Sequence, residues 1–139
     1  ARMDSLQAAV LLEKLLVFDM ELEGRQVVAT HYSELLQELK QDASLVLPYI
    51  EENNRSTWAQ YTIQVDNRDR VRKRLLSAGI PSAVHYPLVL FHQMAIKQEG
   101  LDCPNSATLA QKVMSLPIHP YLEARTQQWI VDELSKGLH

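Results

Sequence analysis

The chain has 139 residues, of which 46% are hydrophobic and 22% charged, and its formal net charge is −3. This composition is typical of one soluble globular domain, and the weak negative charge argues against a nucleic-acid-binding protein, which carries an excess of Lys and Arg. A single cysteine, Cys103, cannot form an internal disulfide, which fits a reducing compartment. The sequence has no signal peptide and no apolar run of about 18 residues that could span a membrane. We therefore expect a cytoplasmic protein.

The first predicted element is a long amphipathic helix. Asp4 suits the N-cap position, and Gln7 follows three residues later, as in a capping box. Apolar residues recur at helical spacing from Leu6 to Leu39, which predicts one helix, or two in line, over residues 4–40. Gly24 is the point where this helix could bend. The stripe in its first half comprises Leu6, Val10, Leu12, Leu15, Leu16 and Met20.

A compact domain of this size cannot bury so long a stripe. We expect the first half of the helix to pack on another domain or on a partner subunit. The sequence also begins with Ala1 directly before the first turn of this helix, without a starting Met. Both features predict that the chain is a piece of a longer protein.

The clearest strand pattern covers residues 58–65, where apolar and polar residues alternate. One face carries Ala59, Tyr61, Ile63 and Val65, and the other carries Gln60, Thr62 and Gln64. We expect the first of these faces to lie against the core.

A short helix is predicted after this strand. Asp66 is the expected cap, and Val71, Leu75 and Leu76 are expected to point inward. Gly79 ends this helix, Ile80 makes the hydrophobic contact that follows, and Pro81 prevents continuation.

The remaining pattern predicts a strand over residues 82–86, a helix over 105–112, a strand over 113–116 and a closing helix. The closing helix is marked by Leu122, Ile130, Leu134 and Leu138. The predicted fold class is therefore α/β, with a short sheet covered by helices on one side and a long helix before it.

Three places in the sequence carry residues suited to binding. Arg2 opens the chain, His85 and Tyr86 stand where a strand gives way to a loop, and His119 stands in a turn between Ile118 and Pro120. Loops at strand ends are common places for binding side chains. In a strand His85 and Tyr86 would point to opposite faces. The alternative, for both histidines, is a structural role in which the ring is simply hydrogen-bonded.

Other chemistries find little support. The spacing of His85, His92 and His119 fits no compact metal site, and Ser115 lacks the G-x-S-x-G context of a nucleophile. A run of basic residues follows the first strand. With Asp66 and Asp69 beside it, we interpret this run as the solvent-exposed face of a helix. It consists of Arg68, Arg70, Arg72, Lys73 and Arg74. The residues alone therefore give no complete catalytic set.

Four stretches, at residues 2–11, 58–63, 79–87 and 115–121, resemble the DegT/DnrJ/StrS-type sugar aminotransferases in sequence, order and spacing. The resemblance covers essentially the whole chain. It implies the aspartate-aminotransferase-like architecture, known as PLP fold type I, and a homodimer. In this family a large N-terminal domain holds pyridoxal phosphate on a lysine. The enzyme transfers an amino group, usually from L-glutamate, to a keto group of a nucleotide-diphosphate sugar, in the biosynthesis of surface polysaccharides or antibiotic sugars.

Under this resemblance residues 1–40 are the helix that leads from the missing large domain, and residues 41–139 are the small C-terminal domain. Arg2 matches the family's arginine just after an Asn that reaches the cofactor phosphate of the partner subunit, and a guanidinium suits phosphate recognition. His85 and Tyr86 match the His-Tyr pair at the nucleotide-sugar end of the site. Arg2, His85 and Tyr86 are thus the implied substrate-binding residues.

The sequence also departs from a complete family member. No lysine of this chain matches the Schiff-base lysine, so we predict that the chain alone neither holds pyridoxal phosphate nor transaminates. After Pro87 the family often carries a proline and then a His or Asn. Val89 and Phe91 stand there instead, and no second family histidine is assigned to His92.

Within the family, the stretches at 58–63 and 83–87 look closest to enzymes acting on UDP-linked 2-acetamido-3-keto sugars. Two alternatives stay open. One is a non-catalytic or dehydratase-like relative, in which a histidine would replace the upstream lysine. The other is a free-standing interaction domain that binds a partner through the exposed apolar stripe.

Overall fold

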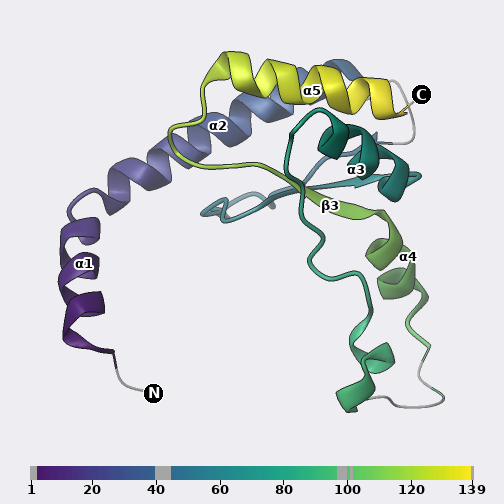
Figure 1. Cartoon of the computed structure of the whole chain (residues 1–139), viewed down its shortest axis with the longest axis horizontal. Helices are drawn as coiled ribbons and strands as arrows, with labels where there is room; N and C mark the ends of the chain where they lie inside the picture. Colours follow the sequence, from purple (N-terminus) through teal and green to yellow (C-terminus); the bar gives the residue numbers. More distant parts are fainter. Residues whose placement is uncertain (1–2, 40–44, 97–99, 101, 139) are drawn as a thin grey trace.

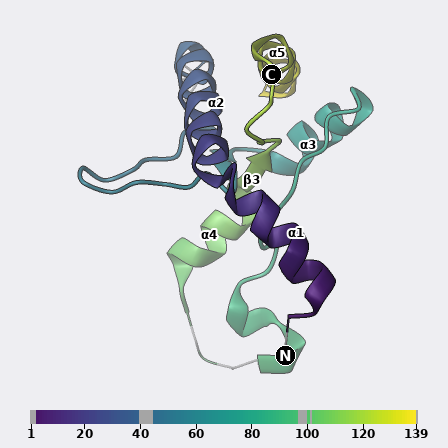
Figure 2. The same cartoon turned by 90° about the vertical axis from the view of Figure 1, so that its left-hand side faces the viewer.

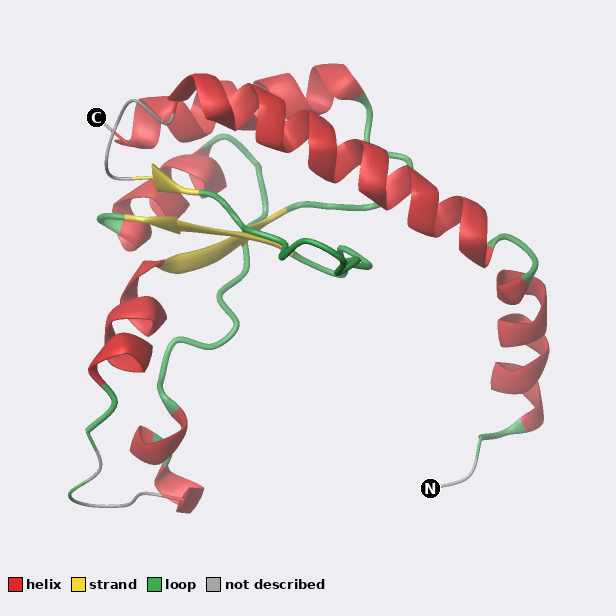
Figure 3. Ribbon diagram, turned by 180° about the vertical axis from the view of Figure 1, so that it is seen from behind, coloured by secondary structure: helices red, strands yellow, loops and turns green. Residues whose placement is uncertain are grey.

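The computed structural model describes residues 3–39, 45–96, 100 and 102–138, and these form a small sheet covered by helices on one face (Figure 1). The sheet is antiparallel with strand order β1-β2-β3, where β1 is Leu45–Val46, β2 is Tyr61–Val65 and β3 is Val113–Leu116. The covering helices are α2 (Phe18–Leu39), α3 (Arg68–Ser77) and α5 (Ala124–Leu138). Figure 3 shows them together on one side of the strands. The predicted fold class is confirmed.

The two faces of β2 differ as the sequence pattern predicts. Tyr61, Ile63 and Val65 are all buried under the helices, where Tyr61 lies opposite Leu116 and Ile63 opposite Met114 of β3. The strand starts later than expected, because Trp58 has a φ of 49° and an extended chain cannot pass through that conformation. Ala59, which we expected on the buried face, is exposed.

The second half of α2 supplies the helical side of the core. Tyr32 is buried and its ring centroid lies 5.1 Å from that of Tyr61. The Tyr32 hydroxyl donates to the carbonyl of Pro117 at 3.0 Å, and the Tyr61 hydroxyl lies 2.9 Å from Ser33 Oγ. Desolvation raises the pKa of both tyrosines, so both stay neutral and can donate hydrogen bonds. These contacts attach α2 to β2 and to the end of β3.

The N-terminal region forms two helices that point in different directions, so the prediction of one helix or two in line is wrong. Helix α1 spans Ser5–Leu15, and its last turn closes with hydrogen bonds from the Leu16 and Val17 amides to carbonyls three residues back, at 3.2 and 3.3 Å. The chain then turns before α2 begins (Figures 1 and 3). Asp4 caps α1 as predicted, since its Oδ1 accepts from the Gln7 amide at 2.8 Å.

Helix α1 has no buried residue. Its apolar stripe stays exposed, as expected for a surface that another part of a protein would cover. The predicted stripe continues past α1 through Leu16 to Met20 at the start of α2, and its exposed fractions run from 55% to 81% over Leu6, Val10, Leu12, Leu15, Leu16 and Met20. Lys40, the predicted end of the long helix, lies outside the described residues.

Two smaller predictions about α3 need correction. Asn67, with a φ of 53°, occupies the N-cap of α3, whereas Asp66 forms an ion pair with Lys112 at 2.7 Å. Leu76 is exposed, while Val71 and Leu75 are buried. The end of the helix is as predicted: Gly79 has a φ of 78°, and the Ile80 amide donates to the Leu75 carbonyl at 2.9 Å.

Residues 82–86 do not form the predicted strand. A single bridge joins Ala83 to Ser115, with amide-to-carbonyl distances of 3.2 and 2.8 Å. The third strand of the sheet is instead β1, which is only two residues long. The helix expected over 105–112 is present as α4 (Pro104–Lys112), and short 3-10 turns cover Leu90–His92 and Met94–Ile96. No helix in the described part of the chain is long and apolar enough to cross a membrane.

Gly24 does not bend α2 but allows a close approach to the loop before α5. A Cβ atom at this position would lie 2.9 Å from both the Cβ and the carbonyl oxygen of Pro120. We expect Gly24→Ala to lower the free energy of unfolding by about 1–3 kcal/mol, measured by urea denaturation. Gln37→Ala, at an exposed position of the same helix, serves as the control. A stabilised Gly24→Ala protein, as helix propensity alone predicts, would contradict this contact.

An ion cluster joins α3 to α5. Glu133, which is only 7% exposed, accepts from Arg74 and from Lys136, whose Nζ lies 2.6 Å from Oε1. The hydrogen bond from Lys136, followed by that from Arg74, lowers the pKa of Glu133. A carboxyl group with a lowered pKa stabilises the fold above its unfolded-state pKa, and that contribution disappears as the pH falls through the folded-state value.

We expect Glu133→Gln to lower the melting temperature by a few degrees at pH 7 and by much less at pH 3. Circular dichroism at the two pH values measures the difference. Asp132→Asn changes the neighbouring exposed carboxyl group and should show no such pH dependence. An equal loss for Glu133→Gln at both pH values would contradict a role for the charge.

Candidate functional site

A groove of about 280 Å³ lies where the end of β3 meets the segment after α3. It occupies the side of the sheet that faces away from the helices, since Ser115 in its floor is paired with Thr62 rather than with a core residue. The two hydroxyl groups lie 2.9 Å apart. The groove is lined by Ala59, Gln60, Pro81, Ser82, Ala83, His85, Ser115, Leu116, Pro117 and Ile118.

His85 reaches this groove because the chain before it is attached to β3. The bridge between Ala83 and Ser115 fixes the backbone two residues ahead of the imidazole. Tyr86 is not among the lining residues, and 72% of it is exposed. Its ring lies edge-on to that of His85, with centroids 6.0 Å apart, and the peptide bond between the two residues is cis. Of the predicted His-Tyr pair, the structure places only His85 in the groove.

The groove is lined by apolar and uncharged polar residues and one histidine, and no Asp, Glu, Lys or Arg is among them. Its polar groups belong to Gln60, Ser82, His85 and Ser115. Within the described part of the chain, the side chains of Gln60, Ser82 and His85 have no hydrogen-bonding partner, whereas Ser115 is bonded to Thr62. The groove therefore offers neutral donors and acceptors to a ligand.

The other predicted positions lie elsewhere. Arg2 is outside the described residues. His119 is exposed and not in the groove; its Nδ1 accepts from the Tyr121 amide at 3.2 Å. The Tyr121 hydroxyl donates to Glu21 at 3.1 Å, and this bond raises the pKa of Tyr121. These bonds attach the turn before α5 to the start of α2, which fits the structural interpretation of His119.

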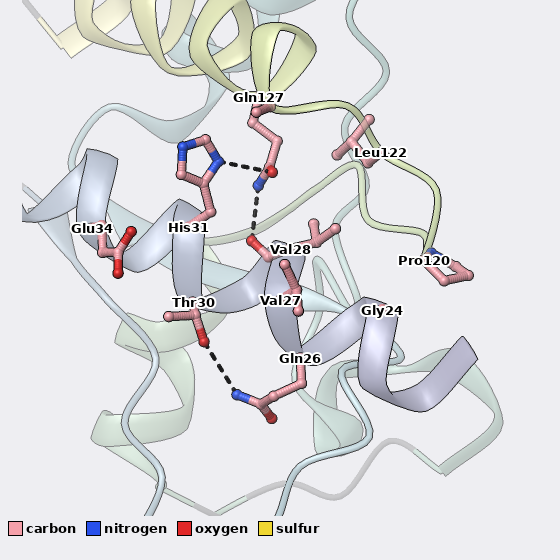
Figure 4. A pocket seen from close by; sticks show the side chains of 11 residues that line it. Gly24, Gln26, Val27, Val28, Thr30, His31, Glu34, Pro120, Leu122 and Gln127 are labelled. Carbon is pink, nitrogen blue, oxygen red and sulfur yellow. Dashed lines mark hydrogen bonds between the residues drawn. The ribbon is translucent and has the colours of Figure 1, made fainter. Parts of the chain in front are cut away.

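A larger groove, of about 670 Å³, runs between α2 and the start of α5 (Figure 4). Three of its polar groups join the two helices. Gln127 donates through Nε2 to the Val28 carbonyl at 2.8 Å, so its Oε1 must accept from His31 Nδ1, 3.0 Å away. The sequence analysis missed His31, because a single histidine within a helix gives no signal of its own. We assign this network a structural role.

Metal chemistry finds no support in the part of the chain that the structure describes, where no group of three or more His, Cys, Asp or Glu residues could hold an ion. Two arginines of the basic run make contacts within the fold. Arg68 donates to the Ala110 carbonyl and to Asp69, and Arg74 pairs with Glu133. Cys103 is exposed.

Comparison with known proteins identifies the family. A model of the DegT/DnrJ/EryC1/StrS aminotransferase family matches residues 1–135. Among curated proteins, the UDP-2-acetamido-2-deoxy-3-oxo-D-glucuronate aminotransferase of Pseudomonas aeruginosa is 46% identical over 123 residues, which cover 88% of this chain and 33% of that protein.

Solved structures agree. A DegT/DnrJ/EryC1/StrS aminotransferase from Brucella abortus superposes with a TM-score of 0.87 at 38% identity, covering 99% of this chain and 36% of the other. DesV of S. venezuelae, solved with a ketimine intermediate, gives a TM-score of 0.88 at 29% identity, covering 97% of this chain and 36% of the other.

The chain thus spans about a third of the length of the relatives it matches. Its sheet, the segment that carries His85 and all of its helices except the last turn of α5 fall within the matched region. The chain belongs to the DegT/DnrJ/EryC1/StrS aminotransferase family.

Proposed function

We propose that this chain is the small, sugar-nucleotide-binding domain of a pyridoxal-phosphate-dependent aminotransferase. The complete enzyme would transfer an amino group from L-glutamate to a keto group of a nucleotide-diphosphate sugar, in the cytoplasm, for a surface polysaccharide. The observation that carries the proposal is the neutral groove with His85, in a chain 46% identical to an aminotransferase that acts on such a sugar. Residues 1–40 would connect to the large domain, and residues 41–139 would form the small one.

The chemistry of the groove suits one part of such a substrate. Neutral hydrogen-bonding groups beside apolar walls are suited to sugar hydroxyl, amide or nucleobase groups, whereas a diphosphate calls for cations. His85 would bind the first kind of group. Arg2 would supply a cation for phosphate, and Tyr86 would stack or hydrogen-bond at the groove's edge.

The cofactor does not fit the groove of this chain. When bound, pyridoxal phosphate supplies an electron sink and a carrier for the amino group. It needs a lysine for covalent attachment, and no lysine or arginine lines the groove. We therefore assign the cofactor site to the large domain of the complete enzyme.

Helix α1 provides the second argument for a larger assembly. None of its residues is buried, its apolar side chains are exposed, and the helix lies apart from α3 and α5 (Figure 2). Contiguous apolar surface of this kind typically marks an interface. We propose that the large domain, in a homodimer of the complete enzyme, covers this stripe.

The proposal predicts that His85→Ala impairs one half of the reaction only. In the complete enzyme, amino transfer from glutamate to the cofactor should proceed at the wild-type rate, because His85 binds the sugar nucleotide. Transfer to the keto sugar should lose about 10-fold or more in efficiency, as expected when a hydrogen bond to substrate is removed. Stopped-flow absorbance of the cofactor follows each half separately.

His119→Ala is the matched control, since this histidine is also exposed but lies outside the groove. It should leave both half-reactions within about twofold of wild type. Equal losses in both half-reactions of His85→Ala would contradict its assignment to the sugar nucleotide.

A second prediction concerns α1. Val10 is 60% exposed, so Val10→Asp should change the unfolding free energy of the 139-residue chain by no more than about 0.5 kcal/mol. In the complete enzyme the same change would bury a charge and should destabilise the protein by about 2–4 kcal/mol. Chemical denaturation of both proteins measures the two values. A complete enzyme as stable as wild type would show that this face of α1 is not covered.

A further inference from the structure

The neutral groove contains an amide side chain that the family comparison does not assign. Gln60 immediately precedes Tyr61, whose side chain is buried beneath the helices. Because neighbouring side chains of an extended segment point to opposite sides, Gln60 is directed away from the core. It is exposed and lines the groove together with His85.

The backbone holds Gln60 in a defined place. The Trp58 carbonyl, two residues earlier, accepts from Arg25 Nη1 at 3.1 Å, and the Trp58 indole donates to Gln26 Oε1 at 2.9 Å. Tyr61, the next residue, is fixed in the core by its bond with Ser33. Gln60 therefore lies between two anchored residues, although it is outside the regular strand. This arrangement lowers the entropic cost of presenting its amide to a ligand.

The other polar side chains that line the groove do not offer the same pair of hydrogen-bonding groups as Gln60. Ser115 is bonded to Thr62, and Ser82 offers one hydroxyl. Gln60 alone presents an N–H donor and a carbonyl acceptor in one plane. This pair is complementary to another amide, which also presents one N–H and one carbonyl. Two related enzymes whose names specify UDP sugars act on substrates that carry an N-acetyl group.

From this geometry we propose that Gln60 is a specificity-determining residue that hydrogen-bonds the acetamido group of the sugar. The proposal rests on the proposed function, since it needs a sugar nucleotide in the His85 groove. It explains why the groove is neutral: a charged side chain at this position would be left unpaired by an acetamido group.

The test compares two ligands that differ in one substituent. UDP-N-acetylglucosamine carries an acetamido group at C2, where UDP-glucose carries a hydroxyl group. Each is titrated into the ¹⁵N-labelled chain, and the side-chain amide of Gln60 and the backbone of His85 are followed by NMR. We expect UDP-N-acetylglucosamine to bind about three- to tenfold more tightly, as one or two added hydrogen bonds imply, and to shift the Gln60 side-chain resonances selectively.

In Gln60→Ala the preference between the two ligands should fall to about one, while weak binding at His85 remains. Gln64→Ala is the matched control, because Gln64 lies on β2 outside the groove and should leave the preference unchanged. Equal affinities of the wild type for the two ligands, or a preference retained in Gln60→Ala, would overturn the role of Gln60 but not the proposed function of the groove. No response of His85 to either ligand would overturn the proposed function of the groove together with it.

Discussion

Burial of Tyr61 beneath α2 is the contact that orients the sheet. Its ring packs against Tyr32 and against Trp58, whose centroid is 5.5 Å away, and its hydroxyl bonds Ser33. With this face of β2 fixed under the helices, strand alternation directs Thr62 and Gln60 to the opposite side. Ser115 of β3 joins Thr62 there, and the chain that carries His85 is bonded to Ser115. The groove thus depends on the packing of one tyrosine on the other face of the sheet.

Much of this arrangement could be predicted from the sequence, because it follows from local signals. Alternation in β2, the glycine stop after α3 and the cap at Asp4 each involve residues within a few positions of one another. The errors arose where distant contacts decide the outcome. Residues 82–86 have the composition of a strand, but only Ala83 finds a partner, on Ser115. Gly24 looks like a helix bend until Pro120, almost a hundred residues away, is placed against it. At the site, the sequence motif pointed to His85, whereas no local pattern distinguishes His31 or marks Gln60 as a lining residue.

The fold also separates two kinds of surface. Residues of α2 from Val28 onward contribute to the core, whereas α1 contributes no residue to it. The groove has free hydrogen-bonding groups but no lysine and no acid-base pair. Under the proposed function, this domain would select and hold the substrate, and the large domain would supply the bond-breaking chemistry. This division agrees with a chain that spans about a third of its aminotransferase relatives.

The most direct test of this account is hydrogen-deuterium exchange of the complete enzyme with and without its sugar nucleotide. Binding in the proposed groove predicts slower exchange in residues 59–61 and 81–86 and unchanged exchange in residues 24–34, which border the larger groove between α2 and α5. Protection confined to residues 24–34 would contradict the account, since it would place the ligand beside His31 and Gln127 instead of His85.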